Sequence, residues 1–176
     1  MELFGERGYE QTTVAEIAER AGLTERTFFR HFSDKREVLF AGGESLQEFI
    51  LSKLAEVAET LEPMAAVIES LRQAGDVFFA ERHAHARRRQ VIIQANAELQ
   101  ERELIKLAGI SAAMMELLRE QGVDAPAASL AAEVGMAIFK VAFARWVAAS
   151  EDQPLSELIL DSAGELAVVA AGTAQN

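Results

Sequence analysis

The sequence predicts an all-α protein, and three observations support that fold class. The chain is 50% hydrophobic and rich in alanine and leucine. No alternating apolar and polar stretch is long enough for a strand, whereas apolar residues recur at helical spacing between Gly and Pro. The 176 residues are enough for a real apolar core in one large or two small domains.

The first element of an expected helix-turn-helix begins at Thr13. The Thr13 hydroxyl can cap the free backbone N–H groups, and Glu16, three residues later, can reach back to complete a capping box. The apolar face of this helix is formed by Val14, Ile17, Ala18 and Ala21. Gly22 follows, where a left-handed backbone can end the helix.

A second short helix is expected after this turn, with Thr24 as its cap. Phe28 and Phe32 lie four residues apart and should face the core together with Leu23. The outward face then carries Glu25, Arg26, Thr27, Phe29, Arg30 and His31. Such polar, cationic and aromatic groups on a short helix suit the major groove of DNA, although helix-turn-helix geometry also occurs in proteins that never touch DNA.

The rest of the chain is expected to form further helices separated by clear punctuation. Asp34 caps a third helix, with Glu37 as its box partner. From Lys35 a long linking helix should run to about Glu59, weakened near its middle by two glycines. The later helices are expected from Pro63 to Phe78, Ala84 to Gln94, Asn96 to about Gln121, Pro126 to about Ala149, and after Pro154 to about Ala171.

Charge and composition restrict the function classes. The net charge is −11, and residues 1–38 hold eight acids and six bases, or −2, so most negative charge lies outside the helix-turn-helix. The segment Leu130 to Ala149 is interrupted by Glu133, Lys140 and Arg145, so no membrane partner is expected. With no cysteine and no signal-like start, disulfides and thiolate metal sites are excluded and the cytoplasm is the expected location.

Glu6 to Phe40, ERGYEQTTVAEIAERAGLTERTFFRHFSDKREVLF, resembles the DNA-binding domain of TetR-type (TetR/AcrR) transcriptional regulators. The family's usual pattern is Gly-aromatic, Thr-Thr-x-x-x-Ile-Ala, Ala-Gly-Val-Ser, Thr-aromatic-aromatic and Phe-x-x-Lys, and the match covers about a fifth of the chain. The resemblance implies a DNA-binding domain at 1–40 and a larger helical domain for effector binding and dimerisation at 41–176.

The same resemblance implies roles for individual residues. Thr13 would cap its helix and touch a phosphate, and Thr24 would cap the recognition helix. Base edges and thymine methyl groups would be met by Glu25, Arg26, Thr27 and Phe29, and phosphates by Arg30, His31 and Lys35. Arg26 is the expected base reader, because a guanidinium can donate to guanine O6 and N7 together.

Two features depart from the family pattern. Phe29 stands where the family usually has Tyr, so a phenolic hydroxyl that would donate to a phosphate is absent, and affinity should be lower there. Met1 lies only seven residues before Gly8, inside the first helix of the family pattern, so this helix is expected to be truncated or shortened.

The final two helices carry apolar stripes. The helix after Pro126 is rich in small side chains, namely Ala127, Ala128, Ala131, Ala132, Gly135, Ala142, Ala148 and Ala149. The last helix presents Leu155, Leu158, Ile159, Ala163, Leu166, Ala167 and Val169. Such a pair could complete a monomeric core, but in TetR-like proteins the corresponding pair packs against its symmetry mate, which implies a homodimer.

The middle helices are then expected to hold a small-molecule effector. Candidate lining residues are Phe78, Phe79, His83, Ile110, Met114, Leu117, Phe139, Phe143 and Trp146. Each of them is equally suited to an ordinary core. No metal or cofactor is expected, because His83 and His85 point in different directions on a helix and have no acidic or thiolate partner at metal spacing.

A second similarity concerns the C-terminal part. NAELQERELIKLAGISAAMMELLREQG and AAEVGMAIFKVAFARWVA are similar to the C-terminal domain of mycofactocin-type TetR regulators, some of which respond to long-chain acyl-coenzyme A. This similarity implies an acyl-coenzyme A-like effector whose acidic head group is attracted by Arg87, Arg88 and Arg89. A run of three arginines is also typical of a solvated helix face.

Three functions follow as hypotheses. The first is a dimeric, ligand-responsive repressor that binds a pseudo-palindromic double-stranded operator and is released by a small apolar or amphipathic effector. The second is a helical small-molecule binding protein with impaired DNA binding. The third, a small helical enzyme, would need a convergent acid-base cluster, and the sequence offers neither a nucleophile elbow nor a phosphate loop, so no enzyme activity is expected.

Overall fold

The fold is all-α, as predicted, in a computed structural model that describes residues 1–149 and 153–172. No strand occurs within those two ranges. The helices are α1 (Glu2–Arg7), α2 (Val14–Arg20), α3 (Glu25–His31), α4 (Glu37–Phe40), α5 (Gly43–Val57), α6 (Pro63–Phe78), α7 (His83–Gln94), α8 (Ala97–Glu120), α9 (Ala125–Ala148) and α10 (Leu155–Ala170).

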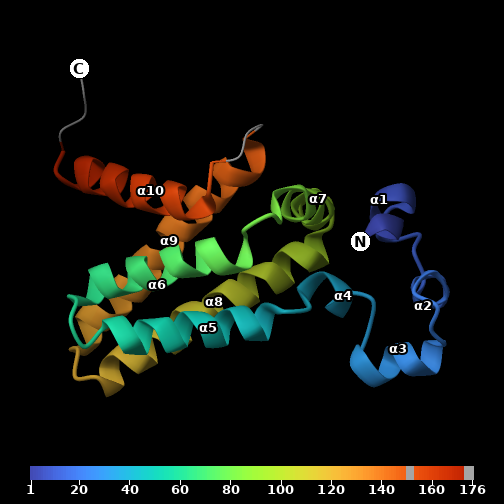
Figure 1. Ribbon diagram of the computed structural model, residues 1–176, viewed down its shortest axis with the longest axis horizontal. Helices are drawn as coiled ribbons and strands as arrows, with labels where there is room; N and C mark the ends of the chain where they lie inside the picture. Colours follow the sequence, from blue (N-terminus) through green and yellow to red (C-terminus); the bar gives the residue numbers. More distant parts are fainter. Residues whose placement is uncertain (150–152, 173–176) are drawn as a thin grey trace.

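The molecule consists of a small head and a larger body (Figure 1). We call α1 to α3, residues 1–36, the head, and α5 to α10 the body. The short helix α4 leads from one to the other. Within the body, α6 packs on α5, α9 and α10, while α8 packs on α5 and α9 and α10 also packs on α9. The head meets the body where α1 contacts α7.

The predicted linking helix from Lys35 to Glu59 is wrong as a single element. It is divided into α4 and α5, because Gly42 takes a left-handed backbone with φ 82° between them. The expected helix cap at Asp34 is wrong, because α4 begins at Glu37 with Arg36 as its N-cap; Asp34 Oδ1 instead holds the preceding turn, accepting from the backbone N of Arg36 at 2.8 Å and of Glu37 at 3.3 Å. The chain therefore turns between head and body, and the residues around this turn become accessible to a ligand.

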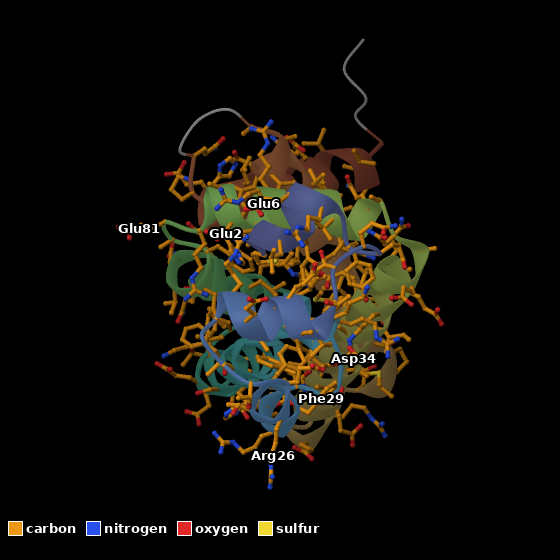
Figure 2. The ribbon with its side chains drawn as sticks, turned by 90° about the vertical axis from the view of Figure 1, so that its right-hand side faces the viewer. Glu2, Glu6, Arg26, Phe29, Asp34 and Glu81 are labelled. Carbon is orange, nitrogen blue, oxygen red and sulfur yellow. The ribbon has the colours of Figure 1, made fainter. Side chains whose placement is uncertain are left out.

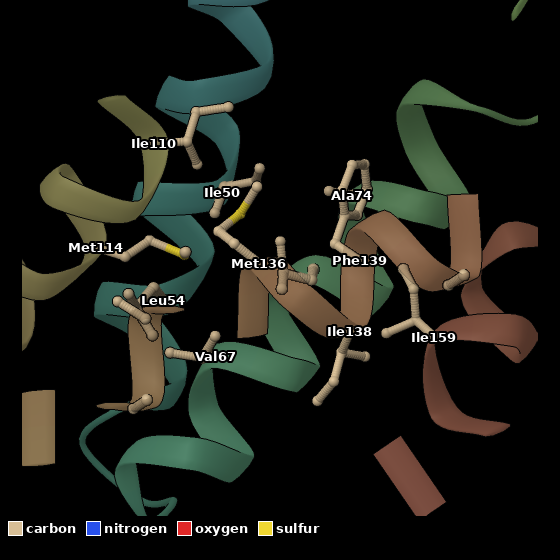
Figure 3. Packing of buried hydrophobic residues seen from close by; sticks show 14 of the residues in the cluster. Ile50, Leu54, Val67, Ala74, Ile110, Met114, Met136, Ile138, Phe139 and Ile159 are labelled. Carbon is tan, nitrogen blue, oxygen red and sulfur yellow. The ribbon is translucent and has the colours of Figure 1, made fainter. Parts of the chain in front are cut away.

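The body core is tightest where α6 crosses α9 (Figure 3). Val67 is fully buried on α6, and Gly135 on α9 lies directly against it. A Cβ atom at Gly135 would lie 2.2 Å from Val67 Cγ1 and 3.5 Å from Leu71 Cδ1. A glycine is therefore required here by close packing rather than by its backbone conformation.

Gly135→Ala is accordingly expected to lower the free energy of unfolding by about 2 kcal/mol, because the stiff Val67 side chain cannot rotate out of the way. Chemical denaturation followed by circular dichroism measures this. The matched control is Gly109→Ala on α8, where an added Cβ meets nothing within 4 Å; the higher helix propensity of alanine should there raise stability by up to about 1 kcal/mol. Equal effects at both glycines would contradict the packing argument.

Candidate nucleic-acid interface and internal cavity

The helix-turn-helix is built by the local signals read from the sequence. Thr13 Oγ1 accepts from Glu16 N at 3.3 Å, and Glu16 Oε2 accepts from Thr13 N at 2.9 Å, which completes the capping box. Gly22 has φ 68° in the turn. Thr24 Oγ1 then accepts from Thr27 N at 3.2 Å and caps α3. These bonds fix the angle at which α3 leaves the turn.

The outward face of α3 is exposed as predicted, but Leu23, in the turn before α3, is not buried as expected. Phe28 is buried and packs on Phe32, whereas Phe29 is 53% exposed. Arg26 points away from the protein at the tip of the head (Figure 2). Leu23, expected in the core, is 45% exposed, because its backbone N donates to Ala18 O at 2.8 Å and holds the residue in the turn at the surface.

Three of the five arginines of the head form ion pairs with carboxylates inside the head. Arg7 pairs with Glu16, Arg20 with Glu6 at 3.1 Å, and Arg36 with Asp34 at 2.5 Å. The hydrogen bond from Arg36 is the main reason that the pKa of Asp34 lies below its usual range. Among residues 1–40, all of which are described, Arg26 and Arg30 are the arginines without an ion pair. Both lie on α3, so free positive charge is concentrated on the recognition helix.

Lys35 lies in a different setting from the one expected. Its Nζ donates to the carbonyl oxygens of Tyr9 at 2.8 Å, Thr12 at 3.2 Å and Glu10 at 3.3 Å, and it lies 4.3 Å from the centroid of the Tyr9 ring. These contacts tie the end of the helix-turn-helix to the loop between α1 and α2. A phosphate contact by Lys35 would have to replace at least one of these bonds.

The joint between head and body is a small core closed by two arginines. Leu39 and Phe40 of α4 pack with residues of α1, α7 and α8. Arg89 of α7 donates from Nε to Leu39 O at 2.7 Å, and its guanidinium lies 5.0 Å from the Phe40 ring centroid. Arg102 of α8 lies on the same ring at 5.1 Å and pairs with Glu37. The helix α4 is thus fastened to α7 and α8 at both ends.

A cavity of about 560 Å³ adjoins this joint. The residues Val38 to Gly43 form part of its wall, facing apolar side chains of α5, α6, α8 and α9. Of the predicted lining residues, Phe78, Phe79, Ile110, Phe139 and Phe143 line it. The others do not line it: Met114 is buried in the core, Leu117 packs against that core, and His83 and Trp146 stand behind the aromatic wall.

The wall on the side of α7 and α8 is charged; the sequence had suggested Arg89 for such a role but not Glu103 or Lys106. Arg89 donates to Glu103 through Nη2 at 2.7 Å and Nη1 at 3.2 Å, and both side chains are less than one-fifth exposed. Burial alone would raise the pKa of Glu103, but the hydrogen bonds and charge of Arg89 lower it below its usual range. Lys106, one helical turn from Glu103, also lines the cavity. Of the three arginines proposed to attract a head group, Arg89 alone lines it, while Arg87 and Arg88 are exposed.

Metal chemistry finds no support at the histidines. His83 Nε2 lies 2.8 Å from the backbone O of Trp146, so this nitrogen is already engaged. In the described ranges 1–149 and 153–172, no group of three His, Asp or Glu side chains is placed to hold a metal ion.

Comparison with known proteins agrees with this geometry. Residues 1–41 match the family of bacterial regulatory proteins described as the tetR family. The chain is 39% identical over 72 residues to the HTH-type transcriptional regulator TcmR of Streptomyces glaucescens, covering 41% of this chain and 32% of TcmR. It is 33% identical over 78 residues to the HTH-type transcriptional activator FasR of Mycolicibacterium smegmatis, covering 44% and 34%. The aligned part is therefore about a third of each relative's length.

The fold extends the likeness over the whole chain. The crystal structure of Thermus thermophilus FadR, a TetR-family repressor in complex with lauroyl-CoA, is similar with a TM-score of 0.53 and 23% identity, covering 100% of this chain and 92% of that one. None of these matches supports the narrower likeness to mycofactocin-type regulators. The matched family consists of transcription factors rather than enzymes. Residues 1–41 thus carry a helix-turn-helix that matches the tetR family of bacterial regulatory proteins, and the whole chain is similar in fold to a TetR-family repressor.

Proposed function

We propose that the protein is a ligand-responsive transcriptional regulator that binds a pseudo-palindromic operator as a homodimer. The observation that carries this proposal is the outward face of α3, where Arg26 and Arg30 are free of ion pairs while the other arginines of the head are paired. A short capped helix with exposed guanidinium groups fits the major groove. The strongly negative body keeps nonspecific DNA binding weak.

The proposed DNA contacts fall into two kinds. Arg26, Thr27, Glu25 and Phe29 would face bases, and Arg26 would donate to a guanine. Phosphates would be met by Thr13, Arg30 and His31, and the cap Thr24 orients the helix. We assign Lys35 a positioning role within the head, since its ammonium group is held by three carbonyl oxygens.

Dimerisation is proposed through α9 and α10, where only part of the predicted stripes is exposed: Leu166 and Val169 of α10 remain available, whereas most small residues of α9 do not. The small residues Ala128, Ala131, Ala132, Gly135 and Ala142 of α9 are buried in the protomer's own core. That burial also explains how α9, which by length and composition alone would pass for a membrane span, is accommodated in a helical core. The exposed apolar side chains on the two helices include Leu130, Val141, Leu160, Leu166 and Val169. A second copy covering this face would place two recognition helices on successive turns of DNA.

The cavity is the proposed effector site, because α4 is part of its wall. A ligand that favours a different position of Val38 to Gly43 would change the spacing of the two heads and lower operator affinity by its differential binding to the two states. Thermus thermophilus FadR is a repressor described in complex with lauroyl-CoA, and this supports an apolar or amphipathic effector, with an acyl-coenzyme A-like molecule as one candidate. Release of DNA by effector would make the protein a repressor acting in the cytoplasm.

The test is selection of bound duplexes from random DNA with the full chain, followed by footprinting. The expected result is a pseudo-palindromic site with half-sites about one or a few helical turns apart and two protomers per duplex by mass measurement. Recovery of no enriched sequence by a folded protein would overturn the proposal. It would favour instead a small-molecule binding protein with impaired DNA binding, an alternative that the internal ion pairs of Arg7, Arg20 and Arg36 support.

A further inference from the structure

The cavity combines an apolar interior with an excess of cations. Its titratable lining groups are Arg82, His85, Arg89, Glu103, Lys106 and Lys140. Glu103 is the single acid among them, and it is paired with Arg89. The cavity is therefore lined by more cations than anions, although the protein as a whole has a net charge of −11.

Among the described residues, Lys106 is the half-buried lining cation without a hydrogen bond or ion pair, whereas Arg82, His85 and Lys140, which also lack an ion pair, are exposed. Its side chain lies beside Gly43, with Nζ 3.6 Å from the position that a Cβ on Gly43 would occupy. Throughout the described parts of the chain no hydrogen bond or ion pair is recorded for Nζ of Lys106. Burial lowers the pKa of the Lys106 ammonium, an effect that the Glu103 carboxylate partly offsets. A buried ammonium without a bonded acceptor is costly unless something else supplies the anion.

From this geometry we propose that the cavity binds an amphiphile with an anionic head group, and that Lys106 is the residue that selects the anion. This inference rests on the proposed effector site and names its ligand class. The head group would accept hydrogen bonds from Lys106 Nζ, and the apolar tail would lie among Phe79, Phe139 and Phe143. Charge-assisted hydrogen bonds in a partly dry site are strong enough to discriminate a charged head from a neutral one.

The position of Lys106 also connects the ligand to the head. Arg89 lines the same wall and holds Leu39 O at 2.7 Å. An anion at Lys106 competes with Glu103 and Leu39 for the donors of Arg89. Occupancy therefore weakens the bond that fastens α4 to α7, three residues before the turn at Gly42.

The test uses the full chain without DNA and three probes: dodecanoate, dodecanol and lauroyl-coenzyme A, all kept below their aggregation concentrations. Trp146 is the chain's single tryptophan and lies 5.7 Å and 5.8 Å, between ring centroids, from the cavity-lining Phe79 and Phe143. Its fluorescence reports occupancy, with calorimetry as the second readout. We expect dodecanoate to bind at least about tenfold more tightly than dodecanol, which has the same chain and no charge.

Lys106→Gln should remove this preference, while Lys106→Arg should keep most of it. The matched control is Arg88→Gln on α7, which removes an exposed cation that does not line the cavity and should leave the preference unchanged. Tight binding of lauroyl-coenzyme A but not dodecanoate would keep the anionic class and assign the head to the phosphates. If Lys106→Gln does not fold, the relative affinities of dodecanoate and dodecanol for the wild type and for Lys106→Arg still test whether the cavity prefers an anion.

Equal binding of dodecanoate and dodecanol to the wild type, or an unchanged preference in Lys106→Gln, would overturn the inference. Neither result depends on operator binding. A chain that finds no operator but prefers the anion through Lys106 would overturn the proposed regulator and support the ligand class. A neutral ligand that releases operator DNA would support the proposed regulator and overturn the anionic ligand class.

Discussion

Arg89→Met is expected to lower the free energy of unfolding by about 3 kcal/mol, because it leaves the Glu103 carboxylate buried without its partner. The side chains of Arg89 and Glu103 are 13% and 18% exposed, so water cannot replace the lost guanidinium effectively. The same change removes the donor to Leu39 O. Urea denaturation followed by circular dichroism measures the loss, and amide hydrogen exchange in residues 37–40 should accelerate because α4 is no longer fastened to α7.

The control for this variant is Arg87→Met, two residues away on α7. Arg87 is exposed and makes no recorded ion pair among the described residues, so its loss should change stability by no more than about 0.5 kcal/mol. The double variant Arg89→Met with Glu103→Leu should recover part of the loss, since no charge is then left unpaired. A single variant Arg89→Met as stable as the wild type would show that the pair does not hold the joint.

The helix-turn-helix was predictable because its determinants are local. The capping box of Thr13 and Glu16, the left-handed Gly22 and the cap at Thr24 each involve residues three or four positions apart. Such bonds form in the same way whatever packs around them. The exposure of Leu23 escaped prediction because it depends on how deeply the turn is covered by the rest of the head, which local spacing does not specify.

The charged wall of the cavity could not be predicted, because it depends on contacts between residues far apart in the sequence. Aromatic residues such as Phe79 and Phe143 were expected there because they are large and apolar, and they do line it. Arg89, Glu103 and Lys106 were not recognised as one group, since they come from two helices and meet only when α7 packs on α8. Glu103 and Lys106, an acid and a cation three positions apart on α8, are typical of a solvated helix face. Only the tertiary structure reveals that this face is buried.

For the last two helices, the sequence did not show which face is buried in the protomer. Spacing correctly predicted apolar stripes on α9 and α10, but it could not tell which stripe faces the protomer's own core. Gly135 and Ala142 were grouped with a dimer face, whereas both are buried against the body. The deciding factor is the close approach of α6 at Val67, which is a property of the crossing and not of either helix.

Arg26→Ala is expected to weaken binding to the selected operator at least about 30-fold, the largest functional effect among the head residues. A bidentate contact with guanine contributes about 1–3 kcal/mol, and a dimer would lose it in both half-sites, which gives about 2–6 kcal/mol in total. Arg26 forms no ion pair in the free head, so no stabilising contact within the protein is lost with it. Circular dichroism should show an unchanged melting curve, and titration of a fluorescent operator duplex measures the affinity.

A comparison with Arg30→Ala separates base reading from phosphate binding. If Arg30 contacts a phosphate, its loss weakens binding to the operator and to a scrambled duplex alike and reduces the salt dependence by about one counterion per half-site. Loss of Arg26 should instead reduce the difference between the two duplexes, because the lost energy is specific to a base. Arg119→Ala, at the C-terminal end of α8, controls for the change in net charge and should leave both affinities unchanged. Equal losses on both duplexes for Arg26→Ala would place its guanidinium on the DNA backbone and move base reading to Thr27 and Phe29.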